Sequence, residues 1–326
     1  MTMGELMLRL SPPRYERFLN TDSFESYYGG GEANVAISLA QFGHNAYYIS
    51  RLPDNDIGHS ALNMLRRFNV KTDYIKMAGE RIGIYFSETG VSMRPSKVIY
   101  DRKQSAFTQI VPEDYDFERI FKDCAIYAIS GISPALSREA RDFTLYTARK
   151  AKEYGCIVSL DYNYRSKLWS RQACDAFMQE LMPYVDILVG YIPYGVDWES
   201  EEVNYEQVER AFLEYIDKYN LLLMASTIRN SISASNNDLY ALMHDGTQFV
   251  QSNTYSIRVV NRIGGGDAFT AGLLSELLYG SSMVDALEFA VAASSWKHTI
   301  VTDHNIATRE EILKVAKGNL SGNVER

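Results

Sequence analysis

Short apolar runs and helix-like stretches alternate in the middle of the chain. The runs CAIYAIS (124–130), CIVSL (156–160) and DILVG (186–190) are separated by helical patterns near 137–154 and 171–182. This order predicts parallel strands, because each helix returns the chain to the same end of the sheet. We therefore expect an α/β fold with helices on both faces and ligands beyond the carboxyl ends of the strands, where Asp161 follows CIVSL.

The later segments predict an antiparallel edge and a helical C-terminal part. LLLMAST (221–227) follows a helix near 205–218, and ISAS (232–235), DLYALMHD (238–245) and QFVQS (248–252) are typical of shorter strands joined by the turns SNND and DG. Apolar residues then recur at helical spacing and predict core positions; they are Phe269, Leu273, Leu277, Val284, Leu287 and Val291.

The first hundred residues have a different pattern. IGIYFSE (82–88) and KVIYDR (97–102) predict strands with no helix between them, and an earlier helix from Glu32 to Phe42 ends at Gly43. We expect one ribokinase-like α/β domain over residues 1–326, with a small β lid inserted from roughly 11–30 and 80–104. Uncovered lid edges favour pairing with another subunit, so we expect a homodimer or higher homo-oligomer.

Charge and composition argue against several classes of partner. A net charge of -8 without a basic stripe disfavours nucleic acid. Glu5 and Arg9 interrupt the apolar start, and no later run reaches membrane-spanning length, so we expect a cytoplasmic protein with no membrane partner. The three cysteines lack C-x-x-C spacing and the five histidines are scattered, which disfavours a protein-held metal.

The strongest local signal for chemistry is RIGGGDAF (262–269). The strand-like YSIRVV precedes it, and a well-patterned helix follows. Gly264, Gly265 and Gly266 leave backbone N–H groups free to approach a phosphate, and the helix N-terminus adds a partial positive charge. The segment therefore predicts an anion-binding turn suited to phosphoryl transfer.

Asp267 lies at the start of that helix and has two interpretations. A carboxylate there commonly caps the helix. Alternatively, it accepts the proton of an attacking hydroxyl beside the bound phosphoryl group. The helix N-terminus predicts a low pKa for Asp267 and proton transfer late in the reaction.

A second glycine cluster, YGGGEAN (28–34), also precedes a helix. Taken alone, it is equally consistent with a tight turn. Neither cluster matches G-x-x-x-x-G-K-[ST], and G-x-G-x-x-G followed by an acidic residue is not found, so a P-loop and a dinucleotide-binding site are disfavoured.

Together the two clusters resemble the ribokinase-like (PfkB) carbohydrate kinases, which carry Gly-Gly-x-x-x-N early in the chain and G-x-G-D late. Within this family the chain resembles kinases of 2-keto-3-deoxygluconate in Y-x-R-K-x-S-A (100–106), SGISPALS (130–137) and D-x-N-x-R (161–165). The resemblance covers nearly the whole chain. It implies ATP-dependent phosphorylation of a terminal hydroxyl to a 6-phosphate, with Asp267 as the catalytic base.

The resemblance also implies a sugar-acid site between sheet and lid. Its residues would be Gly30, Asn34, Tyr85, Tyr100, Arg102, Ile132, Arg165 and Asp303. Independently of the resemblance, planar guanidinium groups suit a substrate carboxylate, and Arg102 and Arg165 could supply them. In isolation these arginines are more typical of a solvated surface and the tyrosines of a strand face.

For the nucleotide, the resemblance implies ATP bound with Mg²⁺ by Asn163, Thr227, Arg229, Gly264, Gly265 and Gly266. A surface role for Arg229 is the alternative. Two departures from the family pattern stand out. The chain has Tyr191-Ile192-Pro193-Tyr194 where N-x-x-E is usual, so Mg²⁺ would be held mainly by ATP oxygens and water. Gly265 replaces a usual alanine, which should loosen the turn.

Two alternatives stay open. Another sugar kinase of the same fold, acting on fructose, tagatose phosphate or a deoxygluconate isomer, would differ in its lid residues. A catalytically weak sugar-acid sensor would follow if the missing N-x-x-E abolished turnover.

Overall fold

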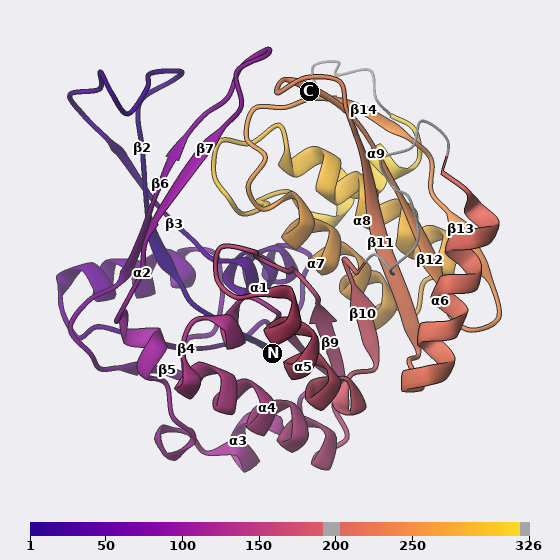
Figure 1. The fold of residues 1–326 in the computed structure, drawn as a ribbon, viewed down its shortest axis with the longest axis horizontal. Coiled ribbons are helices and arrows are strands. Elements are labelled where there is room, and N and C mark those ends of the chain that lie inside the picture. Colours follow the sequence, from indigo (N-terminus) through magenta and orange to yellow (C-terminus); the bar gives the residue numbers. More distant parts are fainter. Residues whose placement is uncertain (192–202, 320–326) are drawn as a thin grey trace.

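A long mixed sheet runs through the centre of the molecule in the computed structural model, which describes residues 1–191 and 203–319 (Figure 1). The strand order is β13-β12-β11-β10-β9-β8-β1-β4-β5, with β14 paired to β12. The strands are β1 (Thr2–Met3), β4 (Tyr48–Leu52), β5 (Ile75–Met77), β8 (Ile126–Ser130), β9 (Ile157–Asp161), β10 (Ile187–Val189), β11 (Leu223–Ser231), β12 (Asn236–His244), β13 (Phe249–Gln251) and β14 (Tyr255–Arg258).

Most of this sheet is parallel, which confirms the α/β prediction. The pairs from β5 through β11 are parallel, while β12 runs antiparallel to β11, β13 and β14. One strand prediction was wrong. ISAS (232–235) forms the turn between β11 and β12, and the predicted turn SNND falls largely within β12. Backbone pairing extends each strand by several residues, and a propensity pattern does not reveal this.

Helices cover both faces of the sheet. One buried cluster contains side chains of α1 (Gly31–Gln41), α2 (Asp56–Arg67), α7 (Gly265–Leu278), α8 (Met283–Lys297) and α9 (Arg309–Ala316). A second cluster contains side chains of α3 (Phe117–Phe121), α4 (Arg138–Glu153), α5 (Arg171–Leu181) and α6 (Tyr205–Tyr219). Both faces of the sheet are therefore covered by helices and shielded from solvent, as is usual for a parallel sheet.

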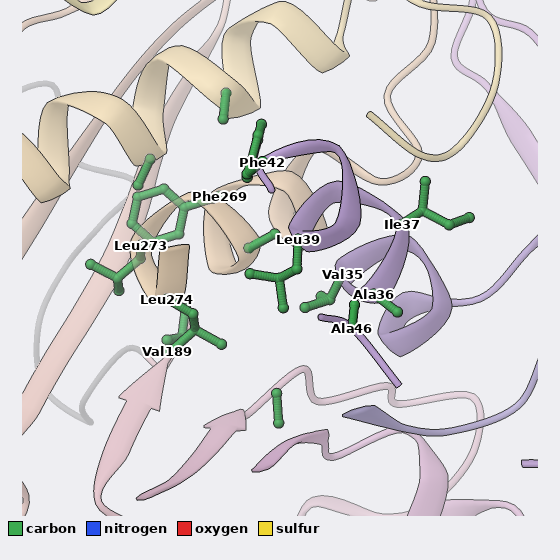
Figure 2. Packing of buried hydrophobic residues seen from close by; sticks show 14 of the residues in the cluster. Val35, Ala36, Ile37, Leu39, Phe42, Ala46, Val189, Phe269, Leu273 and Leu274 are labelled. Carbon is green, nitrogen blue, oxygen red and sulfur yellow. The ribbon is translucent and has the colours of Figure 1, made fainter. Parts of the chain in front are cut away.

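Helices α1 and α7 pack side by side in the first cluster. Leu39 of α1 and Phe42, the C-cap residue of that helix, lie in it with Phe269 and Leu273 of α7 (Figure 2). Each such side chain stabilises the fold by about 1.5–3 kcal/mol on burial. The packing holds together the two helices that begin at the two glycine clusters.

Val284 is a wrong core prediction. Its neighbours Leu287 and Val291 are buried in α8, but Val284 is 46% exposed. It lies in the first turn of the helix, close in sequence to Leu278 and Tyr279, which are also exposed at the end of α7. Helical spacing identifies which face of a helix is apolar. It does not indicate at which residue that face is no longer covered by neighbouring elements.

A separate four-stranded sheet projects from the main body (Figure 1). Its order is β3-β2-β6-β7, with β2 (Met7–Ser11), β3 (Glu25–Gly29), β6 (Gly83–Glu88) and β7 (Lys97–Asp101). Its first strand begins at Met7, before the expected start near residue 11. None of the helices described here is long and apolar enough to cross a membrane.

Candidate active site

A cavity of about 610 Å³ opens at the carboxyl ends of β9 and β10, with residues of the four-stranded sheet on its wall. Almost every site residue expected from the sequence lines it. These are Gly30, Asn34, Tyr85, Tyr100, Arg102, Ile132, Asn163, Arg165, Thr227, Arg229, Gly264, Gly266, Asp267 and Asp303. Gly265 is the exception. The structure thus gathers residues that are up to 273 positions apart into one hollow.

The turn before α7 exposes its backbone to this cavity. Gly264 has a φ of 85°, and a Cβ atom there would lie 1.6 Å from the carbonyl oxygen of Asp303, so only glycine fits. A Cβ atom on Gly266 would meet nothing within 4 Å, which leaves the cavity side of the turn open. Free amides at a helix N-terminus can therefore bind an anion here.

Asp267 does not cap α7. The N-cap is Gly264, and no side-chain capping bond is present. Instead, the Asn34 amide donates to Oδ2 of Asp267 over 2.7 Å. Asn34 is 2% exposed in the first turns of α1, so helix packing fixes the orientation of the Asp267 carboxylate. The capping interpretation is therefore wrong, and the second carboxylate oxygen is available to a ligand.

The expected low pKa of Asp267 is also wrong. Burial raises the pKa of this carboxyl, while the Asn34 hydrogen bond and the charges of Arg165 and Lys297 act in the opposite direction. Removing the charged form from water outweighs the helix N-terminus and the nearby cations. The buried carboxylate is consequently a better proton acceptor than a solvated one.

Two further buried carboxyl groups line the cavity and were not assigned from the sequence. The hydroxyls of Ser130 and Ser133 donate to Oε1 of Glu32 over 2.7 and 2.8 Å, and burial raises its pKa. Burial first, and then the Asp267 charge, raise the pKa of Asp161 to about 7. The position of Asp161 at a strand end was the available signal. Glu32 lies within the second glycine cluster.

These carboxylates do not form a metal-binding centre of their own. Among residues 1–191 and 203–319, no group of three His, Cys, Asp or Glu side chains is arranged to hold a metal ion.

The two arginines expected at the sugar acid differ in their partners. Arg102 donates from Nε and Nη2 to Glu5, which is 3% exposed and also accepts from Ser105. Arg165 is exposed in the loop after β9 and forms no ion pair with any residue that the structure describes. Glu5 thus balances Arg102, whereas the charge of Arg165 remains open to a ligand. Nothing in the sequence paired Glu5 with Arg102.

Asp303 belongs to a second buried ion pair. Arg9 of β2 donates to Oδ1 of Asp303 over 2.5 Å, Asn261 donates to the same oxygen over 3.1 Å, and the Tyr85 hydroxyl donates to Oδ2. Burial raises the pKa of Asp303 to about 6, although Arg9 acts in the opposite direction. These bonds join the four-stranded sheet to the C-terminal segment at the cavity wall.

The wall beyond the turn is basic. Thr227 and Arg229 lie on β11, and Arg262 donates to the Ser233 carbonyl over 3.0 Å. Burial, and then the neighbouring Arg262, lower the pKa of Arg229. Arg262 also lines the cavity but was not assigned, although it stands within the glycine motif.

The next stretch of the cavity wall carries Asn163. Its amide donates to Asp161 over 3.1 Å.

The first departure from the family pattern, at residues 191–194, falls partly outside the described residues. Tyr191 is buried, and its hydroxyl contacts that of Tyr215. Ile192, Pro193 and Tyr194 lie outside the described residues.

The second departure from the family pattern is Gly265 in place of the usual alanine. A Cβ atom on Gly265 would come within 2.2 Å of the His298 ring, so the imidazole fills the space that an alanine methyl would take. The looser turn expected from Gly265 stays a prediction.

Comparisons with known proteins agree with this geometry. The family model described as pfkB family carbohydrate kinase matches residues 1–303. The 2-dehydro-3-deoxygalactonokinase of Haloferax volcanii is 33% identical, over 98% of this chain and 97% of that protein. A crystal structure of the Thermotoga maritima 2-dehydro-3-deoxygluconokinase is 42% identical, with a TM-score of 0.92 over 97% of this chain and 98% of that one. The Bacillus subtilis 2-dehydro-3-deoxygluconokinase is 26% identical, over 88% and 85%.

Proposed function

The chain belongs to the pfkB family of carbohydrate kinases, and we propose that it transfers the γ-phosphoryl group of ATP to the terminal hydroxyl of 2-keto-3-deoxygluconate, giving the 6-phosphate. That sugar acid is also called 2-dehydro-3-deoxygluconate. The observation that carries the proposal is the juxtaposition of the oriented Asp267 carboxylate with the open turn at Gly264–Gly266, on a cavity that also holds the free cation of Arg165.

A sugar acid fits this cavity better than a neutral sugar. Arg165 offers uncompensated charge, and Arg102 still has Nη1 free because its bonds to Glu5 use Nε and Nη2. Guanidinium groups form paired, charge-assisted bonds to carboxylates. The substrate carboxylate would lie against these two groups, with its other end toward Asp267. Gly30, Tyr85, Tyr100, Ile132 and Asp303 would contact the chain of hydroxyls between them.

The proposed reaction is an in-line displacement. The terminal hydroxyl oxygen forms a bond to the γ-phosphorus as the bond from that phosphorus to the β-bridging oxygen breaks, and ADP leaves with the electron pair. The proton passes to the free carboxylate oxygen of Asp267. Asn34 holds the other oxygen, so the base points in one direction. Positioning and charge stabilisation account for most of the rate in such transfers.

The turn at Gly264–Gly266 and the basic wall would hold the nucleotide. The backbone amides of Gly266 and Asp267 would face the transferring group, while Arg229 and Thr227 would contact the phosphates and Asn163 would orient Asp161 near them. Mg²⁺ bound to the phosphate oxygens would supply further neutralisation of charge. Glu32 and Asp161 also line the cavity, and their carboxylates would accept hydrogen bonds from water molecules bound to that ion.

The four-stranded sheet would act as the lid of this site and as a dimer interface. Its outer strand β7 exposes Ile99 and Tyr100, and the turn beside it exposes Met93. An uncovered strand edge with apolar side chains favours pairing with a second copy. A dimer by light scattering that dissociates on Ile99→Lys would support this, whereas a wild-type monomer would contradict it.

An ATP-coupled assay across a panel of acceptors tests the substrate. The panel holds 2-keto-3-deoxygluconate, its galacto epimer, gluconate and fructose. We expect the highest kcat/KM for 2-keto-3-deoxygluconate. The Haloferax relative favours including the epimer as a second candidate. Fructose turnover above both acids would contradict a sugar-acid site, and sugar-acid binding without ADP release would indicate a sensor.

A further inference from the structure

Lys297 is a buried lysine near the catalytic turn that the proposed mechanism does not use. It is the last residue of α8 and is 0% exposed. Its ammonium donates to the carbonyl oxygens of Asn261 and Ile300 over 3.2 and 3.4 Å. Within residues 1–191 and 203–319, no carboxylate forms an ion pair with it. A buried charge without a carboxylate is costly, so it requires an explanation.

The two carbonyl oxygens come from the segments that form the catalytic turn. Asn261 precedes the turn at Gly264, and Ile300 precedes Asp303, whose carbonyl packs against the Cα atom of Gly264. A Cβ atom on Gly264 would lie 3.4 Å from Cε of Lys297. The lysine therefore lies directly behind the turn, on the side away from the cavity, and it is not a lining residue.

The electrostatics match this placement. Burial, and then the Arg9 charge, lower the pKa of the Lys297 ammonium to about 7, while Asp267 acts in the opposite direction. Lys297 in turn opposes the raised pKa of Asp267. An anion in front of the turn would favour the charged lysine in the same way as Asp267 does. The charge would then be stabilised most when the site is filled.

We propose that Lys297 is a positioning residue for phosphoryl transfer, a built-in cation behind the anion-binding turn that stabilises the phosphoryl charge and the ionised Asp267. Its place in a nest of carbonyl oxygens is one that K⁺ or NH₄⁺ would also suit, because both ions are bound by backbone carbonyls. The inference rests on the phosphotransferase activity but not on which sugar acid is accepted. Failure of the inference and failure of the proposed substrate are therefore separate results.

Two substitutions separate the charge of Lys297 from its packing. Lys297→Met keeps the length of the side chain and removes the charge, while Lys297→Gln keeps N–H donors for the two carbonyls without a charge. We expect both to lower kcat by about 10- to 100-fold, the lower part of the range for loss of preorganised electrostatic stabilisation. The KM for the sugar acid should change by less than about threefold, because Lys297 does not reach that end of the cavity. Full activity in Lys297→Gln would show that Lys297 serves only as a hydrogen-bond donor to the carbonyls of Asn261 and Ile300. That result would overturn the proposal.

Chemical rescue and a matched control complete the test. NH₄⁺ or K⁺ should restore at least about a third of the lost rate to Lys297→Met, whereas tetramethylammonium at equal ionic strength should not, because it is too large for the space. The wild-type enzyme should not distinguish these salts. Leu287→Ala, buried in the same helix and remote from the charge, should lower Tm without a rescue by NH₄⁺.

The pH dependence of kcat/KM gives an independent readout. The groups whose charges interact with that of Asp267 are Glu32 of α1, Asp161 of β9, Arg165 of the loop after β9 and Lys297 of α8. Removing the positive charge raises the pKa of Asp267, so the acid limb should move to higher pH in both Lys297 variants and stay in place in Leu287→Ala. Unchanged kcat, or an unmoved acid limb together with no rescue, would overturn the proposal.

Discussion

The two ends of the cavity are built by different means. The end proposed to bind phosphate, the phosphate end, is built from backbone, since it is formed by the turn at Gly264–Gly266, whose shape is set by contacts with Asp303 and His298. The sugar end is built from long side chains, several already engaged in buried pairs such as Glu5 with Arg102 and Arg9 with Asp303. One end depends on main-chain geometry, and the other on side-chain identity.

Because of this difference, we expect phosphate binding to tolerate substitutions and the choice of sugar to change with them. A side-chain substitution leaves the backbone amide in place unless it distorts the turn, so we expect phosphate binding to persist when other residues change. Side chains of the four-stranded sheet can be exchanged singly, at the cost of the buried charge that each exchange leaves behind. Two relatives are named as kinases of different sugar acids, a 2-dehydro-3-deoxygalactonokinase and a 2-dehydro-3-deoxygluconokinase.

The largest expected effect is at the junction of the two ends. Asp267→Asn should lower kcat by at least about a hundredfold, the lower range for loss of a positioned base, while ATP and sugar-acid binding persist. Asp285→Asn is the matched control, because Asp285 occupies the same position in the first turn of α8. Steady-state kinetics and calorimetric titration measure both. Near-normal turnover in Asp267→Asn would remove it as the base.

A smaller effect should distinguish the two arginines of the sugar end. Arg165→Ala removes an unpaired cation and should raise the KM for the sugar acid by about 10- to 30-fold with little change in Tm. Arg102→Ala should also lower stability, by about 3 kcal/mol, because Glu5 is left buried without its partner. Kinetics with thermal unfolding measure these changes. Equal loss of affinity for a neutral hexose would argue against a carboxylate clamp.

At the phosphate end, two adjacent glycines should respond differently. Gly265→Ala places a methyl group against His298 and should lower the free energy of unfolding by about 1–3 kcal/mol. Gly266→Ala has open space and should change it by less than about 1 kcal/mol. Denaturant titration checks both. If His298 is the obstacle, Gly265→Ala combined with His298→Ala should cost less than the sum of the single changes.

The last expected effect concerns the pH dependence of stability. The folded-state pKa of Asp161 is raised to about 7, above the ordinary carboxyl value near about 3.9, so the protonated form favours folding and stability falls as pH rises between these values. Asp161→Asn should therefore gain about 3–4 kcal/mol relative to wild type between pH 4 and pH 8, because the folded and unfolded pKa values differ by about three. Chemical denaturation at both ends of this window measures it. A constant difference would show that the Asp161 carboxyl titrates normally.

The sequence predicted the parts of the fold whose signals are local. The alternating runs placed β8 to β10 and the helices between them, and the glycine motif identified the turn before α7. Local patterns did not show the turn at 232–235, which depends on pairing between β11 and β12. Motif residues also gathered as expected, because the fold brings strand ends and helix starts together.

Buried partners were beyond the reach of the sequence. Glu5 and Lys297 look like solvated residues in isolation, and their importance comes from contacts with residues about a hundred positions away in one case and with two loops in the other. The pKa of Asp267 was predicted in the wrong direction for the same reason. Its burial follows from the packing of α1 on α7 rather than from its place in a helix.

A crystal structure with a non-hydrolysable ATP analogue and 2-keto-3-deoxygluconate tests the central claim most directly. The account predicts the γ-phosphate within hydrogen-bond distance of the amides between Gly264 and Asp267, and the terminal hydroxyl of the sugar acid about 2.6–3.2 Å from Asp267. A γ-phosphate bound elsewhere, or a sugar acid whose carboxylate faces Asp267, would contradict it.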